Sequence, residues 1–426
     1  MKFFSVCLLA AVLAVGQAET RLEYAPSPPD NPLRGLVPYV EIDGWDRFPH
    51  SLQFHYFSLR DLMTGYDEFD WSPIEEKLAL TKSRGCQMTY RVMLEYPGKS
   101  IQVPQFLVEE GVKITKWHRD AADGGTCQTP DYEDPRLRRA LVSFIEALGE
   151  KYDGDPRVGF LTAGILGLWG EWHNYPRSEL MASKETQILV MDAFERAFAK
   201  TPILLRYPAG EDHYAYASNV NRTFGYHDDS FDWATLDTGR SEDAWFFLPS
   251  LKAAGGLERW REVPIGGEIR PELWEGSFTE SPHPKAQGFD ECVRQTHVTW
   301  LMDTGLFSDR FPLSEERRQR AVQSVQRMGY EFHIASWRKQ GERVEIDVEN
   351  RGVAPFYHDW KAELASGDKV ITRFDLRGIL PGETKTWTVE TKQTGPFRLR
   401  VPNPMEGGKP VRFANREQGE EWLVLP

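Results

Sequence analysis

The sequence has few cysteines and no excess of basic residues. Four of its 426 residues are cysteine, and 51 lysines and arginines stand against 64 aspartates and glutamates, for a formal net charge of −13. This acidic balance argues against a surface for nucleic acid or anionic membranes, because both attract basic proteins. Low-complexity tracts and internal repeats are also missing, and an aromatic content of 12% excludes a disordered chain, since such chains contain few aromatic residues.

Long apolar runs are absent after the first residues. Residues 1–18 begin with a basic Lys2 and continue with an apolar stretch, and Gly16 and Ala18 are the small residues of a cleavage site. This stretch is shorter than the roughly 20 residues that a transmembrane helix needs, so it predicts a secretory signal peptide cleaved near Ala18. We expect a secreted or periplasmic protein without membrane insertion.

Three cysteines remain after such a cleavage: Cys86, Cys127 and Cys292. They allow at most one intrachain disulfide bond, and buried thiols are the commoner interpretation. No CxxC pair is present, which argues against a structural zinc site. We expect neither a bound metal nor a cofactor.

Apolar runs typical of strands alternate with helical patterns between residues 36 and 301. The expected strands are residues 36–40, 55–59, 87–94, 158–168, 202–206, 223–226, 263–267 and 297–301. Helix start signals lie between them: a capping box at residues 72–75, Asp134-Pro135 before an apolar stripe, and Ser183. Eight such units predict an α/β fold, a (β/α)8 TIM barrel over residues 19–329, with a doubly wound sheet as the alternative.

The C-terminal part has a different pattern. Residues 343–349 alternate strictly between polar and apolar, and further short strands are expected at residues 369–374, 385–390, 397–401 and 421–425. Several short strands without helices predict a small antiparallel β-sandwich over residues 330–426. Such a domain can bind sugar, but packing against the barrel is its commoner role.

Two glutamates follow predicted strands at the end of the barrel where active sites form. Glu171 comes after the fourth strand and lies between two tryptophans, and Glu268 comes after two glycines of the seventh strand. Glycoside hydrolysis needs a pair of carboxyl groups, one to protonate the leaving oxygen and one to attack the sugar or activate water. Indole rings stack on sugars and desolvate a neighbouring carboxyl, which is expected to raise the pKa of Glu171. The sequence therefore predicts Glu171 and Glu268 as catalytic residues.

Other polar and aromatic residues are expected at the same end of the barrel. Arg91 and Arg206 lie on the third and fifth strands, where each orients a carboxylate or forms a structural salt bridge. His227 and Asp228 follow the sixth strand. We expect His227 to hydrogen-bond sugar hydroxyls and Asp228 to bind sugar or hold an arginine, and the alternative is a loop turn with aspartate caps. The predicted substrate-binding residues are Trp169, Trp172, His173, Asn174, Arg91, Arg206, His227, Asp228 and Trp300, although Trp300 also suits a core.

The glutamates after strands four and seven resemble those of the superfamily of retaining glycoside hydrolases with (β/α)8 barrels. More closely, the chain resembles a family of secreted, glycoside-hydrolase-like barrel proteins with an attached β-domain, known as domains of unknown function. The matching segments span residues 31–426 and are residues 31–35, 168–173, 226–231, 266–268, 350–355 and 380–382. The resemblance implies that Glu171 is the acid/base and Glu268 the nucleophile.

One residue departs from the superfamily pattern. The residue before the acid/base is usually an asparagine that binds the sugar 2-hydroxyl, and here it is Gly170. Three functions therefore stay open: a glycoside hydrolase, retaining if the resemblance holds; a non-catalytic carbohydrate-binding barrel; and a metal-dependent hydrolase. The last would use His173, His227, Asp228 and His297, but no HxH or HExxH spacing supports it.

The expected partner is a carbohydrate. The acidic balance disfavours highly sulfated glycans unless Arg91, Arg206 and Arg270 form a basic mouth. Sugar, linkage and oligomeric state stay open.

Overall fold

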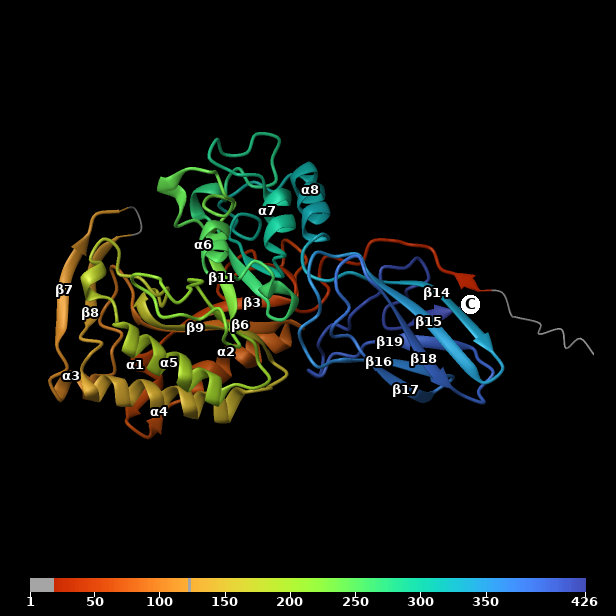
Figure 1. Cartoon of the computed structure of the whole chain (residues 1–426), viewed down its shortest axis with the longest axis horizontal. Coiled ribbons are helices and arrows are strands. Elements are labelled where there is room, and N and C mark those ends of the chain that lie inside the picture. Colours follow the sequence, from red (N-terminus) through yellow and green to blue (C-terminus); the bar gives the residue numbers. More distant parts are fainter. Residues whose placement is uncertain (1–18, 122–123) are drawn as a thin grey trace, which may run out of the picture.

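The computed structural model describes residues 19–121 and 124–426. The predicted signal peptide, residues 1–18, lies outside the described residues. The chain forms a barrel of strands and helices, and a second domain, blue in Figure 1, built from strands. The predicted architecture of a TIM barrel followed by a small antiparallel β-domain is confirmed.

Eight parallel strands form the barrel in the order in which they occur along the chain. They are β2 (Gly35–Val37), β3 (Leu52–Ser58), β6 (Gln87–Glu95), β9 (Val158–Leu168), β10 (Ile203–Leu205), β11 (Gly225–Phe231), β12 (Ile265–Ile269) and β13 (Trp300–Met302). β13 pairs with β2, and one parallel bridge between Tyr39 and Phe54 connects the two ends of the sheet. All eight predicted strands are present, with boundaries that differ by a few residues.

Three of the helices lie where their start signals predict them. They are α2 (Ser72–Ser83), α4 (Pro135–Tyr152) and α5 (Lys184–Ala197). Asp134 and Ser183 cap α4 and α5 through the backbone N–H groups of Arg136 and Thr186. The predicted capping box of α2 is wrong, because Ser72 is already helical and Asp70 accepts the hydrogen bonds from its backbone N–H and hydroxyl.

The remaining helical segments were not predicted. Most are short, and the longest of them begins at the cap of Ser314, a start signal that was not used. They are α1 (Leu59–Leu62), α3 (Gln105–Glu109), α6 (Phe247–Ala253), α7 (Phe289–Thr296) and α8 (Glu315–Val325), with single 3₁₀ turns at Ser178–Leu180, Ser241–Asp243, Arg259–Arg261 and Pro271–Leu273.

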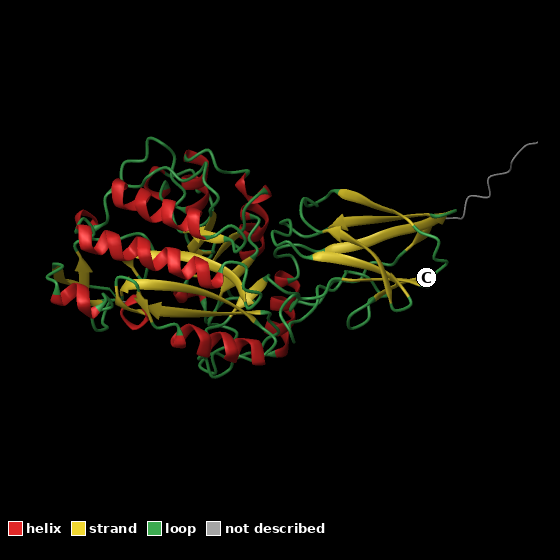
Figure 2. Ribbon diagram, turned by 90° about the horizontal axis from the view of Figure 1, so that it is seen from below, coloured by secondary structure: helices red, strands yellow, loops and turns green. Residues whose placement is uncertain are grey.

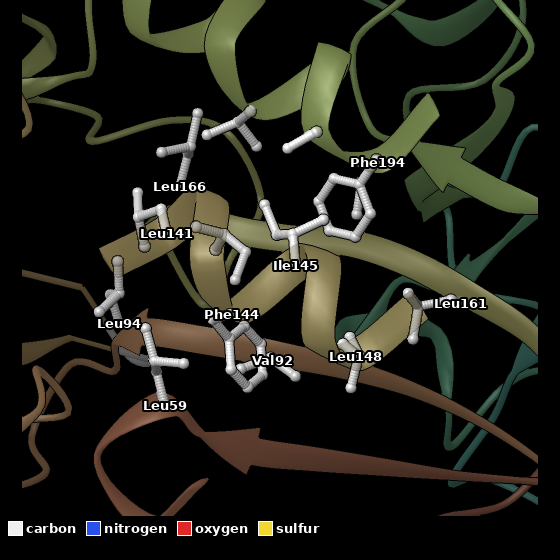
Figure 3. Packing of buried hydrophobic residues seen from close by; sticks show 14 of the residues in the cluster. Leu59, Val92, Leu94, Leu141, Phe144, Ile145, Leu148, Leu161, Leu166 and Phe194 are labelled. Atoms are coloured by element: carbon white, nitrogen blue, oxygen red, sulfur yellow. The ribbon is translucent and has the colours of Figure 1, made fainter. Parts of the chain in front are cut away.

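α4 packs its apolar stripe onto the barrel. Leu141, Phe144, Ile145 and Leu148 recur at helical spacing and are fully buried. Figure 3 shows this stripe against side chains of β6, β9 and α5, among them Val92, Leu94, Leu161, Leu166 and Phe194. Figure 2 shows helices covering the outside of the strands, so the strands are buried on both faces, as the continuous apolar runs of β6 and β9 predict.

Two hairpins extend the loops that follow the barrel strands. β4 (Met63–Gly65) pairs with β5 (Glu68–Phe69) after β3, and β7 (Ile114–Arg119) pairs with β8 (Gly125–Pro130) after β6. Sequence reasoning did not predict either hairpin. Because they follow the carboxyl ends of strands, they lie at the end of the barrel that carries the predicted site, which we call the mouth.

The C-terminal domain consists of two four-stranded sheets with one shared core. The first contains β1 (Thr20–Arg21), β14 (Phe332–Gln340), β15 (Arg343–Asn350) and β18 (Thr384–Glu390), and the second contains β17 (Lys369–Asp375), β16 (Lys361–Ser366), β19 (Phe397–Arg400) and β20 (Leu423–Leu425). Sequence reasoning missed β14 and β16. It also assigned residues 20–21 to the barrel, whereas β1 pairs with β14 of the β-domain.

The β-domain packs on the end of the barrel opposite the mouth. Arg34, which precedes β2, is fully buried and donates hydrogen bonds to the carbonyls of Met328 and Tyr330. Phe160 near the start of β9 contacts the ring of His358 at 5.1 Å between centroids. This placement gives the domain a packing role and keeps its described residues away from the predicted site.

Within the described part of the chain, no helix is both long and apolar enough to cross a bilayer. Cys86, Cys127 and Cys292 are buried thiols, as the commoner interpretation of the sequence has it.

Candidate active site

Arg91 lies at the centre of the mouth and contacts several strands. It is 1% exposed and its Nε donates to Thr162 Oγ1 of β9 at 3.0 Å. Its Nη1 donates to Glu171 Oε1 at 3.0 Å and to Tyr56 Oη of β3 at 3.3 Å, and its Nη2 lies 3.4 Å from the ring of His227 on β11. A buried guanidinium needs acceptors on all sides, and here the inner faces of β3, β9 and β11 provide them.

A tight turn carries Glu171 from the end of β9 into the mouth. The backbone N–H of Leu168 donates to the carbonyl of His173, and that of Glu171 donates to the carbonyl of Leu168. Gly170 has a φ of 70°, and a Cβ there would lie 2.9 Å from the Cα of Gly164 and 3.2 Å from the Cδ of Arg91. The backbone of Gly164 and the side chain of Arg91 therefore leave no unstrained space for a side chain where the superfamily has an asparagine.

Glu171 is ionised because both its carboxylate oxygens face donors. Arg91 contacts Oε1, and His173 Nε2 lies 3.5 Å from Oε2. The backbone N–H of Tyr175 donates to Nδ1 of His173, which puts the ring proton on Nε2, facing Glu171. Burial alone would raise the pKa of Glu171, but the hydrogen bond from His173 and the charges of Arg91 and Arg206 lower it to about 2. The expectation that flanking indoles raise this pKa is wrong.

Glu268 has the opposite environment. It precedes Ile269, the last residue of β12, and is 8% exposed in the barrel interior. Among the described residues no side chain donates a hydrogen bond to its carboxyl. Burial and the charge of Glu171 raise the pKa of Glu268 to about 8. The two glutamates are thus brought to one site, where the charge of one affects the pKa of the other, and their surroundings favour the charged form of Glu171 and the neutral form of Glu268.

A second charge pair lies beside the first. Arg206 Nε donates to Asp229 Oδ2. Asp228, which we predicted to bind sugar or hold an arginine, instead accepts hydrogen bonds from Thr235 Oγ1 at 2.6 Å and the backbone N–H of Ser230. Alternation along β11 explains why Asp229 and not Asp228 pairs with Arg206. Residues 227 and 229 share one face of the strand, and residue 228 lies on the other. Strand periodicity alone could have identified Asp229.

Asn174 lies behind the mouth, on a buried carboxylate that sequence reasoning did not include. Its Nδ2 donates to both oxygens of Glu95, at 3.0 and 3.1 Å, and Tyr132 and Thr129 donate to the same carboxylate. Tyr132 Oη in turn accepts from the backbone N–H of Gly167. The structure therefore gives Asn174 a positioning role in the turn that carries Glu171, in place of the predicted contact with substrate.

The predicted tryptophans have different surroundings. Trp169 is partly exposed, with Arg119 5.1 Å above its ring. Trp172 is 3% exposed, and its Nε1 donates to the carbonyl of Gly164, which places it in the core. Trp300 is fully buried in the barrel interior, where a Cβ on Gly266 would meet its ring at 2.4 Å. The glycine of β12 therefore makes room for Trp300 rather than for a ligand.

The residues of the metal-dependent alternative do not come together. His297 stacks on Trp260 at 3.7 Å and its Nδ1 contacts the carbonyl of Val353, near the β-domain. Burial and the charge of Arg91 lower the pKa of His227 well below its ordinary value. Glu171, His173 and Asp229 do approach within 4.8 Å of one another, but Arg91 and Arg206 already neutralise the two carboxylates.

A small pocket opens next to the charge pairs. Arg206, Tyr207, His227, Asp229, Trp245 and Ser250 are among its lining residues. Trp245 is 49% exposed, and Arg206 Nη1 is buried with no hydrogen-bond partner among the described residues. The pocket combines an exposed indole with an unused buried donor. Trp245 was not predicted, because it lies in a loop without a strand signal.

Comparisons with known proteins identify no family for this chain. No family model matches the sequence, and no curated protein matches it. Among solved structures, a GH5_18 protein from Bifidobacterium longum subsp. longum is 12% identical, with 66% of this chain and 72% of that chain covered and a TM-score of 0.41. The catalytic domain of the beta-amylase from Paenibacillus polymyxa is 10% identical, with 68% and 97% covered and a TM-score of 0.42. The xylanase 10B from Thermotoga petrophila is 9% identical, with 69% and 94% covered and a TM-score of 0.37.

Replacement of Glu95 by Gln tests the buried carboxylate behind the mouth. Burial raises the pKa of Glu95 to about 7, so the folded protein binds this proton more tightly than the unfolded chain does. Stability from this group is present at low pH and is lost as pH rises. Between about pH 5 and pH 8, the free energy of unfolding of the natural protein should fall by about 3 kcal/mol relative to Glu95→Gln.

Denaturant titrations of both proteins across this pH range measure the difference. Glu150→Gln, at an exposed position of α4, is the matched control and should follow the natural protein. Parallel pH profiles for Glu95→Gln and the natural protein would contradict the assignment.

Proposed function

We propose that the protein is a glycoside hydrolase in which Glu171 and Glu268 are the catalytic pair. The observation that carries the proposal is the coupling of two buried carboxyl groups from β9 and β12 at one mouth, with Arg91 acting on both. The surroundings lower the pKa of Glu171 and raise that of Glu268, so the two carboxyl groups favour opposite charge states. Hydrolysis of a glycosidic bond requires such a pair, since one group gives a proton and the other supports the developing positive charge of the sugar.

The charges at the mouth favour a neutral glycan as substrate. Arg91 pairs with Glu171, Arg206 with Asp229, and Arg270 with Glu272. The basic mouth that a sulfated or uronic acid glycan would need is therefore neutralised from within. A neutral sugar binds through hydroxyl groups and the faces of its rings, and the mouth offers the unused Nη1 of Arg206 with the indoles of Trp169 and Trp245.

With Gly170 in place of asparagine, another residue must donate a hydrogen bond to the sugar 2-hydroxyl. The asparagine of the superfamily donates to the 2-hydroxyl, and Arg91 occupies the space next to Gly170. We propose that Arg206 Nη1 supplies the missing donor, because it is buried at the mouth and has no partner among the described residues.

Glu171→Gln and Glu268→Gln test the pair. Each substitution keeps the shape of the side chain and removes its charge or its acidity. Each should lower kcat/KM on the cognate glycan by about 100-fold or more, since positioned acid–base groups contribute 10²–10⁴-fold. The cognate glycan is found by screening plant, algal and microbial polysaccharides for released reducing ends, with Glu150→Gln as the control of unchanged activity.

Full activity of either variant at the pair would refute its catalytic role. Calorimetric binding of a saccharide with no product from the natural protein across the whole panel would instead establish the carbohydrate-binding barrel that Gly170 suggested.

Trp245→Ala tests the pocket. Loss of the indole should raise KM about five-fold with little change in kcat, because stacking on an aromatic ring contributes about 1 kcal/mol. Trp245→Phe should retain most of the affinity. Leu257→Ala removes another exposed hydrophobic side chain outside the pocket and should leave KM unchanged; equal effects of both alanine variants would contradict a subsite at Trp245.

A further inference from the structure

The two glutamates differ in their polar partners. Glu171 has a cation or a donor at each oxygen: the guanidinium of Arg91 at Oε1 and the Nε2–H of His173 at Oε2. Arg206 adds a second positive charge nearby. These contacts leave no acceptor for a proton on Glu171, since Arg91 has only donors and His173 presents its N–H.

Glu268 lacks such partners. In residues 19–121 and 124–426, neither a hydrogen bond nor an ion pair reaches its carboxyl group. The charged groups that act on it are Glu171 and Asp229, which oppose its ionisation, and Arg91 and Arg270, which favour it. Arg91 pairs with Glu171 and Arg270 with Glu272. A negative charge on Glu268 would therefore have no cation paired with it.

Resting on the proposed function, we infer that Glu268 is the proton donor of the reaction and Glu171 the carboxylate that meets the anomeric carbon. This division of roles is the reverse of the one that the resemblance implies. It follows from the contacts of Arg91 and His173, both of which hold Glu171 as an anion. The pKa values agree in direction, since that of Glu171 is lowered to about 2 and that of Glu268 is raised to about 8.

With these roles the hydrolysis takes two steps, and the protons and electron pairs are accounted for in each. Glu268 gives its carboxyl proton to the glycosidic oxygen, and the bond between C1 and this oxygen breaks with its electron pair going to the leaving alcohol. An oxygen of Glu171 forms an ester bond to C1. In the second step the Glu268 carboxylate takes a proton from water, the water oxygen bonds to C1, and the ester electron pair returns to Glu171. The net result is addition of one water across the glycosidic bond.

The close packing around Gly170 accounts for the reversal. Arg91 fills the space beside this glycine and reaches Oε1 of Glu171 from there. A side chain at this position would press against the backbone of Gly164 and the Cδ of Arg91. The same substitution that departs from the superfamily pattern thus permits the buried ion pair that fixes Glu171 as the anion.

Leaving-group kinetics distinguish the two assignments. Dinitrophenyl and phenyl glycosides of glucose, mannose, galactose and xylose, in both anomers, serve as substrates for the natural protein, Glu171→Gln and Glu268→Gln. A dinitrophenolate leaves without protonation, so Glu268→Gln should form the glycosyl-enzyme from this substrate within about ten-fold of the natural rate. With the phenyl glycoside the same variant should fall by about 100-fold or more. Glu171→Gln should lose both substrates equally.

Added azide provides an independent readout. With Glu268→Gln it should attack the glycosyl-enzyme and give a glycosyl azide of retained configuration. With Glu171→Gln it should replace the missing carboxylate and give the inverted azide. Glu150→Gln should behave as the natural protein throughout. Rescue of Glu171→Gln by the dinitrophenyl leaving group, with a retained azide product, would overturn the inference while leaving the proposed function intact.

A measurement without substrate tests the inference even when the protein hydrolyses none of these glycosides. NMR titration of protein labelled with carbon-13 at the glutamate carboxyl groups follows each proton, with resonances assigned by the two glutamine variants. The inference predicts that the Glu268 resonance titrates above neutral pH and that the Glu171 resonance stays that of a carboxylate through the acid range. A titration of Glu171 at the higher pH would refute it, and absence of turnover alone would count against the proposed function only.

Discussion

The buried ion pair of Arg91 and Glu171 is the interaction on which the mouth of the barrel depends. Both side chains lie in the interior, at 1% and 9% exposure, where an unpaired charge is strongly unfavourable. The pair is satisfied by neighbours on β3 and β9 and by the turn after β9, so the guanidinium joins segments far apart in the chain. It also decides which glutamate is ionised, because one guanidinium cannot pair equally well with both.

This constraint links local backbone geometry to chemistry. Gly170 and Gly164 leave the space that Arg91 occupies, and the network from Glu95 through Tyr132 to the backbone of Gly167 fixes the same turn from behind. Glu268 on the facing strand has no such support. The two glutamates therefore favour different charge states because the turn after β9 surrounds Glu171 with polar partners. Glu268 lies within a regular strand that provides none.

Sequence patterns predicted the features that depend on local order. The long buried runs of β6 and β9 and the caps of α4 and α5 are encoded within a few residues of one another, and so is the position of each glutamate at a strand end. Strands β14 and β16 were missed because their patterns are irregular. The hairpin of β7 and β8 was missed although Gly124-Gly125 indicates a turn, because its two short strands are largely polar and show no clear apolar alternation.

Partners distant in the chain set the remaining features. The contact of Asn174 with Glu95 and the packing of Trp300 on Gly266 each join segments tens of residues apart, and no pattern in one segment reveals the other. The charge state of Glu171 was mispredicted for the same reason. Its neighbours in sequence are tryptophans, but its neighbours in space are Arg91 and Arg206.

The location of the proton in the resting pair is the central point, and neutron diffraction observes it directly. A crystal exchanged into heavy water at neutral pH should show a deuteron on the carboxyl group of Glu268 and none on Glu171, with Arg91 fully deuterated beside it. A deuteron on Glu171 and a bare carboxylate at Glu268 would contradict the account.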